Sequence, residues 1–285
     1  MKVMITGATG FVGRNLIKKI SKKKNWKILC LVRKKPHLDN INKIKFHKTD
    51  IYSEKLNIYK KYGVPDVLIH LAWSGLPNYQ ENFHLKTNLP NEKAFLTRAI
   101  NAGVKQIIIA GTCFEYGKLS GKLNEKKICK PNTKYGQAKN LLREHLEKKQ
   151  KQKNFTLQWV RLFYVFGSDQ NPKSLLPALK RSIYNKEKYF NIADGKIQRD
   201  FININIVAKF LVFLCENKNL NGIINCCSGN PISIREFVKA YLKKRSSKIK
   251  IRIGNFKKPK HESEKFWGST SKMLSSSFKF KNKLF

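Results

Sequence analysis

The sequence has no long hydrophobic run and is poor in acidic residues. Its apolar stretches all fall short of the roughly 20 residues that a membrane-spanning helix requires. The first of them, Val3–Ile5, runs directly into a glycine turn and lacks the shape of a secretion signal. We therefore expect no membrane partner and a cytoplasmic location.

Patterns typical of metal sites are also missing. The six cysteines form no C-x-x-C pair, and no group of histidines accompanies them. They are Cys30, Cys113, Cys129, Cys215, Cys226 and Cys227. The sequence therefore predicts free thiols in a reducing compartment and no metal site.

Acidic residues number 18 against 59 basic ones, which gives a formal net charge of +41. An excess of this size raises the question of nucleic acid binding. The lysines, however, lie in small scattered groups such as Lys22–Lys24 and Lys243–Lys244, with no single stripe interleaved with aromatic residues. We therefore do not expect a nucleic acid partner. A positive protein does attract anionic cofactors and nucleotide substrates.

A strand, a glycine turn and a helix start follow one another near the N-terminus. Val3–Ile5 precedes Gly7, Gly10 and Gly13, and a helical pattern comes next. In such a unit the first glycine permits a tight turn, the second lets a phosphate approach the backbone, and the third lets the helix pack on the strand. The free N–H groups at the helix start then face the anion. The motif predicts a pyrophosphate cradle.

Short apolar runs alternate with helical patterns through the first half of the chain. The strand candidates are Val3–Ile5, Ile28–Val32, Ile44–His47, Val67–Leu71, Gln106–Ala110 and Leu157–Leu162, and the helix candidates include Ser53–Tyr62, Asn91–Ala102 and Lys134–Lys149. Nearly all-apolar strands that alternate with helices predict an α/β fold, with a doubly wound parallel sheet covered on both faces.

The alternation loosens after Gly167. A strand near 222–227 is expected to rejoin the main sheet, and Ser233 is expected to cap a helix over Ile234–Lys243. We divide the chain into a Rossmann-like, NAD(P)-binding domain over residues 1–166 and a smaller C-terminal part over 167–285 that mainly binds substrate.

Three polar residues form a candidate catalytic group. Tyr135 and Lys139 are four residues apart in a helical pattern, so their side chains share one helix face. A nearby cation stabilises a phenolate, which predicts a lowered pKa for Tyr135. Thr112 follows an apolar strand, and residues at that edge of an open α/β sheet face the ligand crevice.

With these motifs in this order, the chain resembles the extended short-chain dehydrogenase/reductase family, in its nucleotide-sugar epimerase, dehydratase and reductase group. The segment Thr-Gly-Ala-Thr-Gly-Phe-Val-Gly at 6–13 is similar to the family's cofactor turn. The resemblance implies catalytic roles for Thr112, Tyr135 and Lys139, with Lys139 also binding the nicotinamide ribose. It also implies a homodimer formed by pairing of two long helices.

The resemblance implies further ligand contacts. Those with the cofactor would come from Gly7, Thr9, Gly10, Phe11, Val12, Gly13, Asp50, Ile51, Leu71 and Ala72. Those with a nucleotide-sugar substrate would come from Trp73, Thr112, Tyr164 and Arg199, with Arg199 on the diphosphate. Tyr164 stands where the family usually has an asparagine, so the substrate pocket is expected to differ there.

The cofactor prediction depends on the end of the second strand. An acid at this place holds the ribose hydroxyls of NAD, but here Arg33 and two lysines follow Val32. A guanidinium at this position suits a 2′-phosphate and stacks on adenine. We predict NADPH as the cofactor, with NADH as the alternative.

The neighbours of Thr112 bear on the reaction. By resemblance, the family's 4,6-dehydratases carry an Asp and a Glu directly after the threonine, where this chain has Cys113 and Phe114. Phe114 cannot move protons, and Glu115 is displaced by one residue, so that an extended backbone would turn it to the other side. Phe114 also replaces the cysteine of GDP-fucose-synthase-like epimerases. Dehydration and epimerisation next to the carbonyl are therefore disfavoured.

A 4-ketosugar reductase and a 4-epimerase remain, beside a non-catalytic NAD(P)-binding protein. The stretches 70–79, 111–117 and 225–229 resemble reductases of dTDP-4-keto-6-deoxyhexoses. We therefore expect NAD(P)H-dependent reduction of a nucleotide-linked 4-keto-6-deoxyhexose, which forms dTDP-fucose-type sugars for surface glycans.

Overall fold

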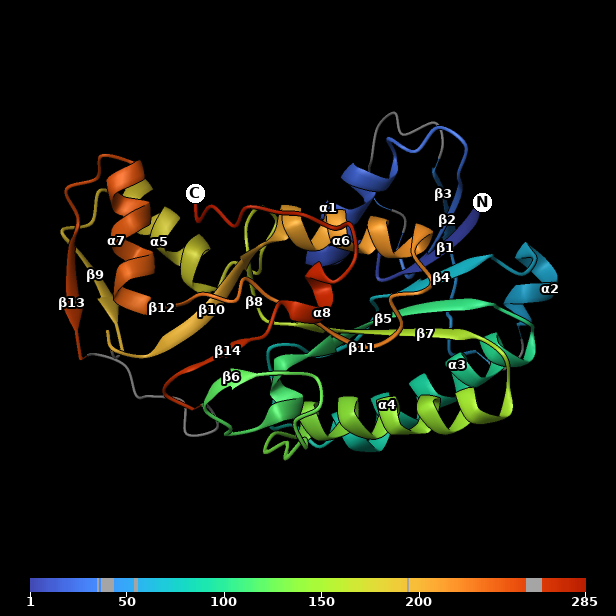
Figure 1. Cartoon of the computed structure of the whole chain (residues 1–285). Helices are drawn as coiled ribbons and strands as arrows, with labels where there is room; N and C mark the ends of the chain where they lie inside the picture. Colours follow the sequence, from blue (N-terminus) through green and yellow to red (C-terminus); the bar gives the residue numbers. More distant parts are fainter. Residues whose placement is uncertain (35, 37–43, 54–55, 194, 255–262) are drawn as a thin grey trace.

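The computed structural model describes residues 1–34, 36, 44–53, 56–193, 195–254 and 263–285 (Figure 1). A seven-stranded sheet forms its centre, with every strand parallel to its neighbours and the order β11-β7-β5-β4-β1-β2-β3. The strands are β1 (Lys2–Thr6), β2 (Lys27–Val32), β3 (Ile44–Lys48), β4 (Val67–His70), β5 (Gln106–Thr112), β7 (Thr156–Leu162) and β11 (Gly222–Cys226). The predicted doubly wound parallel sheet is confirmed.

Helices cover both faces of this sheet (Figure 1). On one face lie α1 (Phe11–Ile20) and α6 (Ile204–Glu216), and on the other α3 (Leu89–Asn101) and α4 (Lys134–Gln152). Each face has its own core of buried aliphatic and aromatic side chains, because strands covered on both sides must be apolar on both sides. This sandwich fixes the carboxyl ends of the strands, where ligands of open α/β sheets bind.

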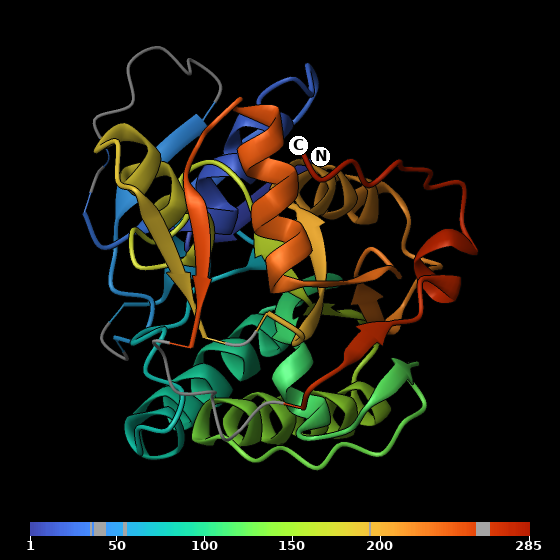
Figure 2. The same ribbon diagram turned by 90° about the vertical axis from the view of Figure 1, so that its left-hand side faces the viewer.

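A smaller unit lies beside those carboxyl ends, at the left of Figure 1 and facing the viewer in Figure 2. It contains α5 (Leu175–Tyr184) and α7 (Ile234–Lys244) and two small sheets. One sheet is formed by β8 (Tyr164–Phe166), β10 (Gln198–Asn203) and β12 (Pro231–Ser233), and the other by β9 (Tyr189–Ile192) and β13 (Lys250–Ile253). The structure also contains a further strand pair, β6 (Gly121–Leu123) with β14 (Phe266–Gly268), and the short helix α8 (Ser271–Leu274).

Local capping decides where two predicted helices begin. The Ser233 hydroxyl accepts a hydrogen bond from the Glu236 N–H, in a capping box that starts α7 as predicted. The helix predicted over Ser53–Tyr62 is shorter, because α2 (Ile58–Tyr62) starts only after Asn57, whose side chain accepts from the N–H groups of Tyr59 and Lys60. Residues 54 and 55 of that prediction lie outside the described residues.

Candidate functional site

A cavity of about 860 Å³ opens at the carboxyl ends of the central strands. Its walls come from the turn after β1, the segments after β2 and β4, the end of β5, the start of α4 and the segment from β8 to α5. The main sheet and the smaller unit therefore both contribute to one site.

The glycine turn at one end of the cavity is tightly packed against its surroundings. Gly7 has φ +71°, and a Cβ there would lie 2.6 Å from the Ala72 nitrogen. A Cβ on Gly13 would collide with the Gly7 carbonyl oxygen. Only glycine fits either place, and the first turn of α1 then faces the cavity with free N–H groups. This cradle fits the phosphates of a dinucleotide.

The structure brings most of the predicted cofactor residues to the cavity wall. Those that line it are Gly7, Gly10, Phe11, Val12, Gly13, Arg33, Leu71 and Lys139. Thr9, Asp50, Ile51 and Ala72 are not among the lining residues. Asp50 is exposed and accepts a hydrogen bond from the Tyr52 N–H, and the Ile51 carbonyl accepts one from Arg98. Thr9 is exposed, and its carbonyl accepts from Arg14.

The three predicted catalytic residues lie together on the cavity wall and are all buried. Thr112 is the last residue of β5, so the strand runs two residues further than predicted. Its hydroxyl oxygen accepts the Phe114 N–H and also interacts with the Tyr135 hydroxyl. The Lys139 ammonium donates a hydrogen bond of 2.9 Å to the Ala110 carbonyl oxygen.

The predicted lowering of the Tyr135 pKa by Lys139 is wrong for this arrangement. Burial raises the pKa of the Tyr135 phenol above its usual value, and Lys139 is not among the groups that shift it. The hydrogen bond with Thr112 opposes the rise but does not cancel it. Burial also lowers the pKa of Lys139 to about 8. Both shifts follow from one cause, because a buried site disfavours the charged form of either group.

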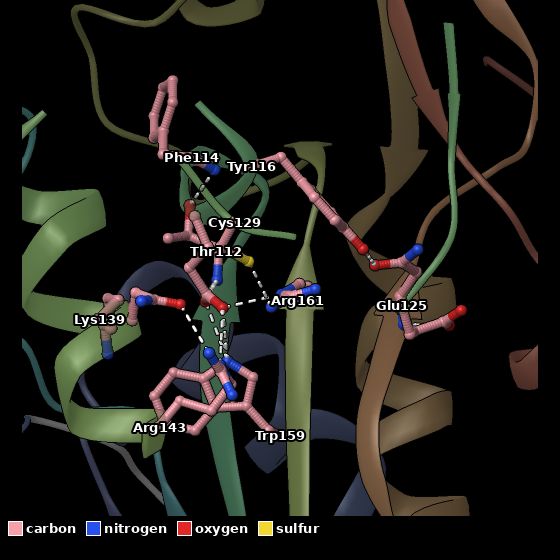
Figure 3. Close-up of polar contacts among 12 residues, drawn as sticks. Thr112, Phe114, Tyr116, Glu125, Cys129, Lys139, Arg143, Trp159 and Arg161 are labelled. Atoms are coloured by element: carbon pink, nitrogen blue, oxygen red, sulfur yellow. Dashed lines mark hydrogen bonds and ion pairs between the residues drawn. The ribbon is translucent and has the colours of Figure 1, made fainter. Parts of the chain in front are cut away.

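A buried ion pair between Glu115 and Arg161 lies next to Thr112 and fixes its backbone N–H. The Glu115 carboxylate accepts hydrogen bonds from the Thr112 N–H (2.8 Å), the Trp159 indole N–H (2.9 Å) and the Arg161 Nε (2.8 Å). Figure 3 shows Trp159 and Arg143 below Thr112 and Arg161 to its right, with a dashed line that joins Arg161 to the Cys129 sulfur. Glu115 does not line the cavity, so it faces away from the substrate side as predicted.

Aromatic residues surround the end of the cavity near Tyr135. Trp73 and Tyr164 line the cavity, as predicted for substrate contacts. Tyr79 and Phe114 line it as well, although neither was predicted as a site residue. Their rings pack against each other at 4.7 Å, and the Tyr135 N–H donates to the Tyr79 carbonyl oxygen. The loop with Tyr79 has no periodic pattern, so the sequence held no signal for this contact.

Arg199 is placed differently from the prediction of a diphosphate contact. It is 2% exposed and is not among the cavity-lining residues. Its Nη1 donates to the carbonyl oxygens of Gln198 (2.8 Å) and Ser263 (2.9 Å). The guanidinium lies 5.3 Å from the centre of the ring of Tyr164, which does line the cavity.

The family model for the "NAD dependent epimerase/dehydratase family" matches residues 3–227. The chain belongs to this family. Among curated relatives, a dTDP-6-deoxy-L-talose 4-dehydrogenase (NAD(+)) of Aggregatibacter actinomycetemcomitans is 29% identical over 276 residues, which are 94% of this chain and 100% of the relative.

Solved structures of the epimerase/dehydratase type share the whole fold. A UDP-glucuronic acid 4-epimerase from Bacillus cereus, in complex with UDP-glucuronic acid and NAD, superposes with a TM-score of 0.85 at 21% identity and covers 100% of this chain and 95% of its own. A UDP-N-acetylglucosamine 4-epimerase from Methanobrevibacter ruminantium M1 gives a TM-score of 0.84 at 21% identity, with 98% and 93% covered. The chain is thus an NAD-dependent nucleotide-sugar enzyme of this family by its sequence match, and the solved structures agree in fold.

None of the helices in the described part of the chain combines the length and the apolar character that a membrane span requires. Within the same residues, no group of three or more His, Cys, Asp or Glu side chains is arranged to hold a metal ion.

Proposed function

We propose that this enzyme reduces the C4 ketone of a dTDP-linked 4-keto-6-deoxyhexose. The observation that carries the proposal is the meeting of Thr112, Tyr135 and Lys139 on one wall of the cavity that starts at the glycine cradle. The relative that spans nearly the whole chain is named as a dTDP-6-deoxy-L-talose 4-dehydrogenase. Oxidation of a C4 hydroxyl and reduction of a C4 ketone are one reaction in opposite directions.

The protein's own groups suit proton delivery to the C4 oxygen. A bound nicotinamide supplies the hydride in this chemistry. Burial keeps Tyr135 protonated near neutral pH, so that it is ready to give its proton to the oxygen that becomes a hydroxyl. The Thr112 oxygen already accepts the Phe114 N–H, which leaves its own proton for the Tyr135 oxygen or for the substrate. The Lys139 ammonium, charged below about pH 8, stabilises negative charge that develops nearby.

The aromatic side chains at the Tyr135 end of the cavity, which we take as the sugar end, favour a deoxy sugar as the substrate. Trp73, Tyr79, Phe114 and Tyr164 present ring faces and edges to the cavity beside Tyr135. A methyl group at C6 loses nothing on leaving water for such a surface, whereas a carboxylate or a hydroxymethyl group needs polar partners. The ring surface therefore favours a 6-deoxyhexose over a hexuronic acid.

The proposed cofactor is NADPH rather than NADH. Arg33, directly after β2, lines the cavity and is followed by Lys34, so cations occupy the place where NAD enzymes of this fold have an acid. A 2′-phosphate pairs with a guanidinium in two parallel hydrogen bonds. The relative named above uses NAD(+) by its name, so both cofactors belong in the test.

The setting of the reaction is also a proposal. We place it in the cytoplasm, as the source of activated sugars for surface glycans, since all six cysteines are free. We further propose that residues 1–166 mainly bind the cofactor and 167–285 mainly the nucleotide sugar. A homodimer through α3 and α4 accounts for the exposed apolar side chain of Leu141 on α4 (42% exposed), and sedimentation velocity measures this state.

The decisive experiment mixes the protein with NADPH or NADH and a series of nucleotide-linked 4-keto-6-deoxyhexoses. Loss of absorbance at the nicotinamide band follows turnover, and NMR identifies the product. We expect turnover with a dTDP sugar, fastest with NADPH. Inversion of an intact UDP sugar by protein that keeps NAD through dialysis would instead establish a 4-epimerase. Cofactor binding without turnover of any sugar would establish a non-catalytic protein.

A further inference from the structure

His84, a buried histidine that was not predicted as a site residue, links several parts of the cavity wall. It begins the π-helical turn His84–Asn88 before α3 and is fully buried. The Trp73 indole N–H donates to its Nδ1 at 3.0 Å, and its Nε2 lies 3.0 Å from the Asn78 carbonyl oxygen. The Asn88 side-chain nitrogen lies 3.3 Å from the same Nδ1. One imidazole thus ties the loop over the site to α3.

These partners fix the protonation state of the imidazole. An indole nitrogen only donates, so the Nδ1 that receives it carries a lone pair. A carbonyl oxygen only accepts, so the single ring proton is on Nε2 and points to Asn78. The arrangement therefore requires neutral His84. Burial lowers its pKa below the usual value, which agrees with this assignment.

The indole held by His84 touches two catalytic side chains. Trp73 lines the cavity, and the Lys139 ammonium lies 3.9 Å from the centre of its ring. The Tyr135 ring meets the Trp73 ring edge to face at 5.7 Å. The hydrogen bond from the indole nitrogen sets the rotation of the ring, and so decides which surface Trp73 offers to Lys139 and to a ligand.

We propose that His84 is a positioning residue that, through Trp73, keeps the Lys139 ammonium and the Tyr135 ring in their places at the sugar end of the cavity. This proposal rests on the proposed function only where it is tested by turnover of a ketosugar. It also has a readout in the protein alone, because Trp73 is a fluorophore.

Protonation of His84 breaks its hydrogen bond with Trp73. A proton on Nδ1 turns the acceptor of the indole N–H into a second donor, and the bond is lost. Lys139, on α4, disfavours the charged imidazole, whereas Glu81, in the preceding loop, favours it. The Tyr135 ring, 5.4 Å away, is uncharged near neutral pH. Since burial is the largest effect, charging occurs below the ordinary value of 6.5. We expect turnover to fall as the pH drops through this lowered pKa.

Two substitutions distinguish the role of Nδ1 from the role of Nε2 in His84. In His84→Asn, the amide oxygen takes the place of Nδ1 and can still accept from Trp73. In His84→Gln, the longer amide takes the place of Nε2 and can serve Asn78 but not Trp73. We expect His84→Asn to keep kcat near that of the wild type and to lose the acid-side fall in the pH profile. We expect His84→Gln to lower kcat about tenfold at every pH, the effect of one missing hydrogen bond.

His145→Asn is the matched control. Like His84, His145 has a lowered pKa, but it is only partly buried and pairs with Thr97, which does not line the cavity. Its substitution should leave the pH profile unchanged. Equal pH profiles for the wild type and His84→Asn, or equal kcat for the Asn and Gln variants, would overturn the proposal.

Tryptophan fluorescence tests the same idea without a substrate. The emission of the wild type is titrated from pH 8 to pH 5 against Trp73→Phe, and the difference reports on Trp73. We expect a transition below pH 6.5 that His84→Asn abolishes. Absence of a transition in the folded wild type would refute the role of His84, whether or not the variants fold. A fluorescence transition in a protein that turns over no sugar would contradict the proposed function but would still support the positioning role of His84.

Discussion

The Lys139 ammonium lies 3.9 Å from the centre of the Trp73 ring, over its face. The contact explains how a lysine that is 2% exposed keeps a charge, because the ring face and the Ala110 carbonyl replace part of its hydration. The compensation is incomplete, and burial lowers the pKa of Lys139 to about 8. A pKa of about 8 means that Lys139 titrates much closer to neutral pH than an ordinary lysine.

Turnover should therefore fall at alkaline pH. Below about pH 8 Lys139 is charged, and above it the proton is lost and with it the stabilisation of negative charge near C4. We expect kcat/KM for the ketosugar to decline as the pH rises through about 8. Stopped-flow measurements between pH 6 and pH 10 record this profile. A rate that stays constant to pH 9.5 would contradict the assignment.

Lys139 should also lower the stability of the folded protein. Because its pKa is about 8 in the folded state and 10.5 ordinarily, the native protein releases this proton at a lower pH than the unfolded chain does. The resulting cost to stability is present in full below about pH 8 and disappears as the pH rises to 10.5. The difference corresponds to at most about 3 kcal/mol at neutral pH. We expect Lys139→Met to raise the free energy of unfolding by roughly 1–2 kcal/mol in urea titrations, while it abolishes turnover. Lys148→Met, at an exposed position of α4, is the control and should change neither.

Tyr135→Phe removes the proposed proton donor and little else. The Tyr135 ring packs among Trp73, Tyr79 and Phe114, and a phenylalanine keeps that packing. We expect turnover to fall by about 10²–10⁴-fold, the usual worth of a positioned proton donor. The dissociation constant for the cofactor, measured by fluorescence titration, should stay the same. Tyr184→Phe, at a side chain that is 87% exposed, is the matched control. An active Tyr135→Phe variant would remove the phenol from the mechanism.

The sequence predicted which residues line the cavity better than it predicted their pKa values. The strand-turn-helix pattern located Gly7 and Gly13, and helical spacing put Tyr135 and Lys139 on one face. The direction of the Tyr135 pKa was wrong because it depends on burial by the aperiodic loop that contains Trp73 and Tyr79. No local pattern encodes how such a loop packs.

The contacts of Glu115 and Arg199 do not follow from the local sequence pattern. Glu115 does face away from the cavity, although residues Cys113–Tyr116 form a 3₁₀ turn and not the extended backbone assumed. The right outcome had a different cause, a capping box between Glu115 and Thr112. Arg199 was expected at the diphosphate, but its hydrogen bonds go to the carbonyls of residues distant in sequence, such as Ser263. Contacts of this range cannot be read from spacing.

Exchange of Arg33 should change the preferred cofactor. If its guanidinium pairs with a 2′-phosphate, Arg33→Ser loses about 1.5–3 kcal/mol of binding to NADPH and little to NADH. We expect the dissociation constant for NADPH to rise more than tenfold, measured by titration of nicotinamide fluorescence. Lys34→Ser removes a neighbouring exposed cation that does not line the cavity and is the control. An equal weakening of both cofactors in Arg33→Ser would mean that Arg33 acts only through general positive charge.

Glu115 gives the strongest expected effect on stability. Its side chain and that of Arg161 are both 0% exposed. Glu115→Ala leaves a buried guanidinium that keeps contacts with the Cys129 sulfur and with Tyr116 but has no carboxylate partner. Removing one partner of a buried ion pair typically costs about 3–5 kcal/mol, which urea unfolding measures directly. Glu144→Ala is the control, because it removes an exposed carboxylate that pairs with the neighbouring Arg143, and it should cost less than about 1 kcal/mol. The Thr112 N–H also loses its acceptor in Glu115→Ala, so we expect kcat to fall in the fraction that folds. Wild-type stability in Glu115→Ala would show that the pair is not formed, since water alone cannot solvate Arg161 at that depth.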